Sequence, residues 1–370
     1  MLLIIVTVVT TGCWDRRELE ERISVLAIGI DHIKGKEDRY RISVQIPIPI
    51  KIAGSGGRGG GSSGDAVKIV TTTGKTVQDA MNNLQKRLNQ QIFVGHTRVL
   101  AISEDVARAG MKAAFDAYRR DPTIRRLLWP VIVKGEARTL LMANPKLSQI
   151  PVVFIMDLIE NGARSGMIPD QTLGDFYSQT SNQALQPIMN YVEATEEDVG
   201  WRGVAVFRNH KMVGTLEDEQ TWVLLQLRDQ MQGGDVVVPL PGNEGDYLTF
   251  RPHFVDTHLE MKHTGGSHHA HYTCTVQGDV IENTKGPQIK GEQGVNKLQE
   301  IIKREMEKRA AELLVKLQKE YRSDVLKLGL WVKGHHQDYW SRHDWETSFP
   351  DLPIKVTYDI RIRRFGMEMQ

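Results

Sequence analysis

Residues 92–134 read IFVGHTRVLAISEDVARAGMKAAFDAYRRDPTIRRLLWPVIVK, and this stretch decides the class of fold. Residues 98–102 predict a buried strand, the run from Glu104 to Tyr118 predicts a helix, and residues 125–134 predict a second strand that Pro130 interrupts. A strand, a helix and a strand in succession are typical of a mixed α/β layer, in which helices cover a sheet.

The same alternation continues on both sides of this stretch. Towards the N-terminus, two strands at 23–30 and 39–46 predict a hairpin around Lys34-Gly35-Lys36. A third strand at 67–72 precedes an amphipathic helix at 76–89, for which Thr73 is a candidate cap. On the other side, the expected elements are helices at 136–142, 150–161 and 173–181 and a strand at 185–193.

The last third of the chain predicts a further sheet and one long helix. Apolar residues recur on one face from Val295 to Tyr321, which indicates an amphipathic helix. The other expected elements are a hairpin at 200–213 turning at Asn209-His210, a helix at 221–230 ended by Gly233-Gly234, a hairpin of strands 254–261 and 270–281 around Gly265-Gly266, and a strand at 354–362.

These elements predict an α+β or mixed α/β fold of three domains, each a β-sheet with packed helices. Residues 13–195 would form an N-terminal α/β domain with a flexible glycine-rich loop at 54–64. Residues 196–240 would form a small middle domain, and residues 241–370 a C-terminal α/β domain that contains the long helix. A chain of 370 residues exceeds what one hydrophobic core usually spans, which favours several domains.

The composition bounds the class of partner. Charged residues make up 25% of the chain and hydrophobic residues 40%, so the chain is globular and not disordered. The net charge is +1, and a nucleic-acid partner normally requires a basic footprint. We therefore expect no nucleic-acid partner.

The N-terminal residues have the layout of a bacterial lipoprotein signal peptide. An apolar run at 2–9 ends at Thr10-Thr11-Gly12, directly before Cys13, and a polar segment follows. The run is shorter than the roughly 20 residues of a transmembrane helix. We expect cleavage of residues 1–12 and a lipid on the Cys13 thiol. The alternative is a frayed hydrophobic N-terminus, since no Lys or Arg precedes Cys13 and Thr10 stands where an aliphatic residue is usual.

Two glycine-containing motifs do not predict phosphate binding. Thr73-Gly74-Lys75-Thr76 imitates the end of a phosphate loop, but a true loop has a glycine five residues before Gly74, where Ile69 stands. A turn before a helix is the simpler interpretation. The loop 54–64 is too long and too rich in glycine for a short ordered cradle, so a linker is favoured.

Six of the twelve histidines lie within residues 253–271, which raises the possibility of a metal site. On a strand, His269 and His271 share one face while His268 points to the other, and His263 across the hairpin could join one face. Because no cysteine or carboxylate stands at a zinc-binding spacing, we favour a polar strand facing water. His253 and His258 complete the set.

The other histidines do not suggest catalysis. His335-His336 and His343-Asp344 lie in a tryptophan-rich stretch, where aromatic residues more often pack a loop than bind a ligand. His96 is a lone histidine before a strand, which favours a structural hydrogen bond. The residues contain no Ser/His/Asp or Cys/His set, so we predict that the protein is not an enzyme, with no catalytic residue, cofactor or metal.

Several segments together resemble the C-subunit lipoproteins of bacterial spore germinant receptors, the Ger(x)C family. The resemblance runs over nearly the whole chain after Cys13. It departs from the family in the uncharged signal peptide, in Thr10 and in the histidine-rich hairpin. The segments are Gly12-Cys13-Trp14-Asp15-Arg16-Arg17-Glu18-Leu19, Thr73-Gly74-Lys75-Thr76, Gly95-His96-Thr97-Arg98-Val99, Arg120-Asp121-Pro122 with Ile124-Arg125, Ser323-Asp324-Val325, Trp340, Trp345, Phe349-Pro350, and Arg361-Ile362-Arg363-Arg364 with Gly366.

The resemblance implies a function that composition and spacing do not. It implies a lipid-anchored, non-enzymatic receptor subunit on the outer surface of the inner spore membrane. Such a subunit acts with two integral-membrane subunits, A and B, in sensing nutrient germinants. Two alternatives remain open at this point: an extracytoplasmic substrate-binding lipoprotein of a transporter, and a secreted metal-binding protein that uses the histidine-rich hairpin.

Overall fold

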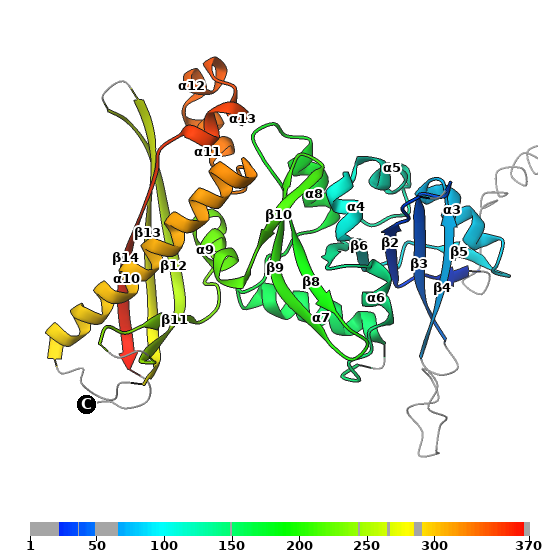
Figure 1. The fold of residues 1–370 in the computed structure, drawn as a ribbon, viewed down its shortest axis with the longest axis horizontal. Coiled ribbons are helices and arrows are strands. Elements are labelled where there is room, and N and C mark those ends of the chain that lie inside the picture. Colours follow the sequence, from blue (N-terminus) through cyan, green and yellow to red (C-terminus); the bar gives the residue numbers. More distant parts are fainter. Residues whose placement is uncertain are drawn as a thin grey trace, which may run out of the picture.

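A computed structural model describes residues 22–35, 37–48, 66–148, 150–242, 245–264, 267–284 and 291–365. The molecule is elongated, with a large sheet and its helices at one end and a smaller sheet with one long helix at the other (Figure 1). The predicted mixed α/β class with packed helices is confirmed. The predicted loop 54–64 and the turn at Gly265-Gly266 lie outside the described residues.

The large sheet has eight strands in the order β10-β9-β8-β7-β6-β2-β3-β4. Strands β2, β6, β7 and β8 run parallel to their neighbours in this group and form its centre. The strands are β2 Ala27–His32, β3 Tyr40–Pro47, β4 Val67–Gly74, β6 Val99–Ser103, β7 Trp129–Val133, β8 Ile188–Ala194, β9 Val199–Arg208 and β10 Lys211–Leu216.

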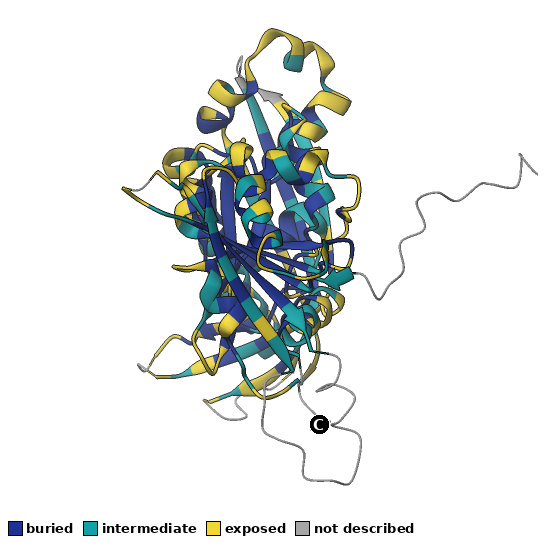
Figure 2. Ribbon diagram, turned by 90° about the vertical axis from the view of Figure 1, so that its right-hand side faces the viewer, coloured by how far each residue is buried: buried dark blue, intermediate teal, exposed yellow. Residues whose placement is uncertain are grey.

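Helices cover both faces of this sheet, which explains why its central strands are mostly apolar and buried along their length. Successive residues of a strand point to opposite faces, so Val99 packs with α6 and α7 while Leu100 packs with α3, α4, α5 and α8. Figure 2 shows these strands as buried residues between more exposed helices. The helices are α3 Val77–Gln85, α4 Glu104–Ala109, α5 Lys112–Arg120, α6 Ala137–Met142, α7 Pro151–Arg164 and α8 Leu173–Thr180.

Three local predictions in this half are wrong. The expected strand 23–30 divides into β1 Arg22–Ser24 and β2, because β1 pairs in parallel with β5 Gln91–Phe93 outside the large sheet. The expected helix from Glu104 to Tyr118 divides into α4 and α5 at Gly110, whose φ is 116°. The cap of α3 is Thr76 and not Thr73, since the Thr76 hydroxyl accepts a hydrogen bond from the backbone N–H of Asp79.

The hairpin β9–β10 turns at Asn209 as predicted, and β9 pairs with β8. The hairpin therefore belongs to the same eight-stranded sheet as β2, β3, β4, β6, β7 and β8. Helix α9 Asp218–Asp229 follows and ends at Gln230 in a left-handed conformation, before the predicted Gly233-Gly234. The division into domains at 13–195, 196–240 and 241–370 stays a prediction.

The small sheet has the order β11-β12-β13-β14, with β12 and β13 forming the predicted hairpin. Helix α10 Gly291–Val315 crosses this sheet and continues into a π-helical turn, η3 Lys316–Tyr321, which confirms the predicted long helix (Figure 1). The remaining elements are β11 Val236–Pro239, β12 Tyr247–Thr264, β13 Ser267–Asn283, α11 Leu328–His335, α12 Gln337–Arg342, α13 Trp345–Ser348, η4 Phe349–Asp351 and β14 Ile354–Phe365.

One hydrophobic core joins the two sheets. Val204 and Val206 of the large sheet belong to the same buried cluster as Phe250 and Tyr272 of the small sheet and Leu313 of α10. Helix α9 contacts β9, β12 and α10, so it fills the space between the sheets. Among the described residues, no helix combines the length and apolarity required to cross a bilayer.

Candidate functional site

Cys13, the predicted lipidation site, lies outside the described residues. The first described residue is Arg22 at the start of β1, nine positions further along the chain. The structure therefore describes the region in which the segment after Cys13 joins the fold, but not the cysteine.

The segment Gly95–Val99 fastens this N-terminal strand to the large sheet. The Thr97 hydroxyl donates a hydrogen bond of 3.1 Å to the carbonyl of Val25, and the backbone N–H of Arg98 donates one of 3.0 Å to Leu26. Nδ1 of His96 lies 3.1 Å from the Ser24 hydroxyl. His96 therefore makes the structural hydrogen bond that we predicted for it.

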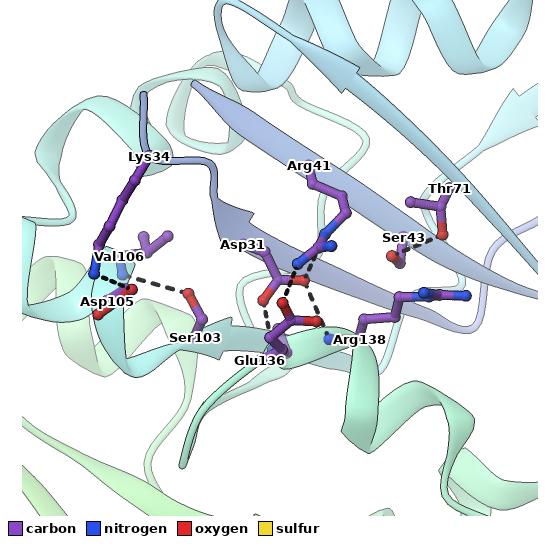
Figure 3. Close-up of polar contacts among 11 residues, drawn as sticks. Asp31, Lys34, Arg41, Ser43, Thr71, Ser103, Asp105, Val106, Glu136 and Arg138 are labelled. Atoms are coloured by element: carbon purple, nitrogen blue, oxygen red, sulfur yellow. Dashed lines mark hydrogen bonds and ion pairs between the residues drawn. The ribbon is translucent and has the colours of Figure 1, made fainter. Parts of the chain in front are cut away.

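A buried carboxylate, that of Asp31, lies near the carboxyl end of β2, one residue beyond the expected strand 23–30. Its two oxygens accept hydrogen bonds from the backbone N–H groups of Ala137, at 2.6 Å, and Arg138, at 3.2 Å, at the start of α6 (Figure 3). Arg41 lies 3.6 Å from Asp31 and also pairs with Glu136 at 2.6 Å. Burial raises the pKa of Asp31, although the two N–H groups and Arg41 oppose this.

The position of Asp31 is one where α/β sheets often bind ligands. The chain leaves β2 towards β3 on one side and leaves β6 towards β7 on the other, so the carboxyl ends of β2 and β6 form a switch point. In this protein Asp31 caps α6, and Ser103 at the end of β6 caps α4 by accepting from the Val106 N–H (Figure 3). These polar groups are engaged with the chain itself, which indicates a structural role.

A pocket of about 550 Å³ lies between α3, β5, α5 and the loop after α5. Val77, Met81 and Ile124 contribute apolar walls, whereas Arg22 and Asp121 contribute charges of opposite sign. Asp121 belongs to one of the segments on which the family resemblance rests. The pocket combines a partly apolar wall with polar groups. Sequence patterns did not predict it, because its lining residues come from four separate segments.

A second buried carboxylate, that of Asp324, connects the C-terminal segments on which the family resemblance rests. Oδ2 of Asp324 accepts from Nε1 of Trp345, at 2.9 Å, and from the N–H of Gly329, at 2.6 Å, while Oδ1 accepts from Leu328. Burial raises the pKa of Asp324 to about 6. The adjacent Ser323 hydroxyl donates to the carbonyl of Phe207 in β9, at 2.6 Å, so the cluster also contacts the large sheet.

Trp345 completes this cluster through aromatic packing. Its ring centroid lies 5.9 Å from that of Trp340 and 6.1 Å from that of Phe349. A side chain at position 329 would place its Cβ 2.4 Å from Nε1 of Trp345, which explains the glycine there. The sequence identified the segments one by one, but only the fold shows that Asp324, Trp345 and Phe349 meet.

The histidine-rich hairpin distributes its imidazoles among different partners. His253 Nε2 lies 3.0 Å from Asp279, His271 Nε2 lies 3.0 Å from the Thr357 hydroxyl, and the His268 ring packs against Tyr339 with centroids 4.4 Å apart. Within the part of the chain that the structure describes, no three His, Cys, Asp or Glu residues converge on a metal site. The side chain of His263 lies outside that part.

The remaining motifs pack as the sequence suggested. Gly74 ends β4, and Thr76 then caps α3, so the segment is a turn before a helix. His335 stacks on Trp331 with centroids 4.6 Å apart, and His343 stacks on Tyr339 at 4.1 Å. The aromatic residues pack against one another as expected, but they do so on helices α11 and α12 and not in the loop that was predicted.

Two family models match the chain. "Spore germination protein N-terminal domain" matches residues 15–194, and "Spore germination B3/GerAC like, C-terminal" matches residues 202–366. Similar proteins include the spore germination protein YndF of Bacillus subtilis, 26% identical over 99% of this chain and 96% of the relative, and the spore germination protein GerQC of Bacillus cereus, 23% identical over 83% and 85%. The crystal structure of the GerBC protein resembles the fold with a TM-score of 0.61, at 18% identity, over 94% of this chain and 99% of that one.

Proposed function

This chain belongs to the GerAC-like family of spore germination proteins, as a C-type receptor subunit, and from that premise we propose that it acts while tethered to a membrane by a lipid on Cys13. The subunit is non-enzymatic. Because the chain belongs to this family, we set aside the two alternative functions, a transporter lipoprotein and a secreted metal-binding protein.

The observation that carries the proposal is the position of Cys13 relative to the family match. The match begins at residue 15, two positions after Cys13, and the described strands begin at Arg22. An apolar run and Thr10-Thr11-Gly12 stand directly before the cysteine. A diacylglyceryl group on this thiol supplies two acyl chains, which is about what stable membrane attachment requires.

The proposed location and partners follow from the resemblance of the chain to receptor C subunits. We place the protein on the outer surface of the inner spore membrane, in a complex with integral-membrane A and B subunits. The two buried carboxylates, Asp31 and Asp324, hydrogen-bond to the chain itself, so we assign them a structural role and expect the subunit to act by binding its partners.

Labelling with radioactive palmitate tests the lipidation of Cys13. Full-length protein and Cys274→Ala should incorporate the label, and Cys13→Ala should not. Cys274 is the matched control because it is the second of the two cysteines, and because its thiol is fully buried with a pKa raised to about 12, which keeps it unreactive. Label that persists in Cys13→Ala would contradict the proposed site.

Spores carrying the same variants test the role of the tether. With Cys13→Ala we expect a loss of rapid germination in response to a nutrient mixture that triggers spores with the unmodified protein. Cys274→Ala spores should respond normally. A normal response of Cys13→Ala spores, with the label absent, would show that the lipid is dispensable for receptor function.

A further inference from the structure

Positive charge gathers at the end of the molecule that carries β1. The segments 75–91 and 112–128, together with Arg22, contain nine Lys and Arg residues and three acidic residues, a net charge of +6, whereas the whole chain has a net charge of +1. All of these basic residues except Arg22 are exposed. The balanced total charge conceals this local excess.

The two segments are neighbours in space. Helix α3 lies in the first and α5 in the second, and both line the pocket of about 550 Å³ together with β5 and Arg22. Figure 1 shows α3, β5 and α5 grouped at one end of the elongated molecule. We call this region, residues 22, 75–91 and 112–128, the basic end.

The acidic residues of the basic end are already engaged within the chain. Asp79 accepts from the backbone N–H of Lys75, Asp116 pairs with Arg120 at 2.9 Å, and Asp121 accepts from Thr123. One cation of this end, Lys75, pairs with Glu37 just outside it, and counting Glu37 leaves a net charge of +5. Exposed cations such as Lys86 and Arg119 thus give this end a positive field, which attracts anionic surfaces.

The pocket in the basic end has the mixed lining that a phospholipid head group requires. The Arg22 guanidinium lies 5.1 Å from the centroid of the Phe93 ring, which fixes it beside the apolar wall formed by Met81 and Ile124. An arginine in this position offers a fork of N–H donors to a phosphate. The apolar wall suits the glycerol and the first methylene groups of a lipid.

The tether places the basic end near the bilayer, a step that rests on the proposed lipidation of Cys13. The nine positions from Cys13 to Arg22 span at most about 30 Å when the chain is fully extended. The lipid would thus hold the basic end, and not the small sheet at the other end of the molecule, within reach of the membrane surface (Figure 1).

We propose that the basic end binds the head groups of anionic phospholipids, with Arg22 in the pocket contacting a lipid phosphate. The protein then rests on the bilayer by this end, and the small sheet with α10 points away from the membrane. The loop that carries Ile124 into the pocket continues to Leu127, which is 76% exposed between Arg126 and the buried Leu128. An exposed leucine beside arginines suits insertion into a membrane interface.

Vesicle cosedimentation tests this proposal without the lipid on the protein. The chain from residue 13 to 370 with Cys13→Ser retains every described helix and strand, since these begin at Arg22. We expect it to sediment with vesicles of phosphatidylcholine and phosphatidylglycerol, but not with phosphatidylcholine alone. Binding should decrease at 0.5 M salt, because salt screens exposed charges.

Charge-reversal variants locate the contact. Lys86→Glu with Arg119→Glu should weaken partitioning by about tenfold or more, and Arg22→Gln by roughly fivefold, since each basic residue near an anionic surface contributes about 1 kcal/mol. Arg363→Glu with Arg364→Glu changes the net charge equally at exposed positions of β14 and should leave partitioning nearly unchanged.

Three outcomes would overturn the proposal. They are equal binding to both kinds of vesicle, equal losses in the two double variants, and no binding to either kind of vesicle, which would be accompanied by loss of other receptor subunits from Lys86→Glu with Arg119→Glu in spores if the basic end contacts a protein. That loss would make the basic end a protein interface. Because the vesicle protein carries no lipid, the result is independent of whether palmitate labels Cys13 in the full-length chain.

Discussion

The indole N–H of Trp345 donates a hydrogen bond of 2.9 Å to the carboxylate of Asp324, and both side chains are buried. The two residues stand 21 positions apart, on either side of α11 and α12. Together with the Ser323 contact to β9, this hydrogen bond fixes the end of the long helix against the large sheet. A neutral donor facing a buried carboxylate is worth more than an exposed pair, because water does not compete for it.

Replacing Trp345 with Phe should lower the free energy of unfolding by about 1–3 kcal/mol, because a buried carboxylate loses one of its donors. Urea denaturation of the chain from residue 13 measures this change. The matched control is Trp331→Phe, which keeps an aromatic ring to stack on His335 and should change stability by less than about 0.5 kcal/mol. Equal losses in the two variants would show that the hydrogen bond adds nothing to ring packing.

Asp324 should make the protein more stable as the pH falls from about 6 to about 4. Burial raises its pKa from 3.8 to about 6, so in this range the folded state holds a proton that the unfolded state has released. A difference of about two pKa units corresponds to a contribution on the order of 3 kcal/mol. Unfolding followed between pH 4 and 7 should show this slope, and Asp324→Asn should flatten it. A variant with the same slope would rule out this carboxyl as the source.

Gly74→Ala should disrupt the packing of α3 on β4. A Cβ at this position would lie 2.3 Å from the backbone nitrogen of Ala80, and backbone cannot move aside as a side chain can. Overpacking of this kind costs about 1–3 kcal/mol, which thermal unfolding followed by circular dichroism would detect. Gly334→Ala is the control, since nothing lies within 4 Å of its Cβ and it stands in α11, so it should be neutral or slightly stabilising.

Side chains of α10 protect the edge of β14. Gln299 accepts a hydrogen bond from the backbone N–H of Ile362, at 3.0 Å, and Glu307 accepts one from Tyr358, at 3.1 Å. The double variant Gln299→Ala with Glu307→Ala should expose a pairing edge. We expect faster amide hydrogen exchange at Tyr358 and Ile362, and self-association in size-exclusion chromatography.

The control for the edge prediction is a double variant on the exposed side of the same helix. Glu300→Ala with Lys308→Ala removes two exposed side chains of α10 and should alter neither exchange nor elution. If both double variants behave alike, the effect comes from the stability of the helix and not from the strand edge.

The predictions that succeeded depend on residues close in sequence. The strand 39–46 and the helix 295–321 have regular apolar periods, and both elements form as expected. The expected strand 23–30 failed because residues 22–24 pair with 91–93, some 70 positions away. The helix from Glu104 failed at Gly110 because α5 begins with a contact between Met111 and His210 of the β9–β10 turn. Neither partner is visible in a local window.

The sequence by itself determined the succession of strands and helices, the mixed α/β class, the absence of a catalytic motif and the resemblance to germinant receptor C subunits. These properties are encoded in local periodicity and in short segments that keep their residues together. Only the tertiary structure decided which distant residues meet. It brought Asp31 into hydrogen-bonding contact with the N-terminus of α6 and Asp324 into contact with the indole of Trp345. It also placed Arg22 in a pocket lined by α3 and α5. Such contacts depend on how the elements pack. When an element turns its apolar face toward the core, its geometry sets which of its polar side chains meet a neighbouring element.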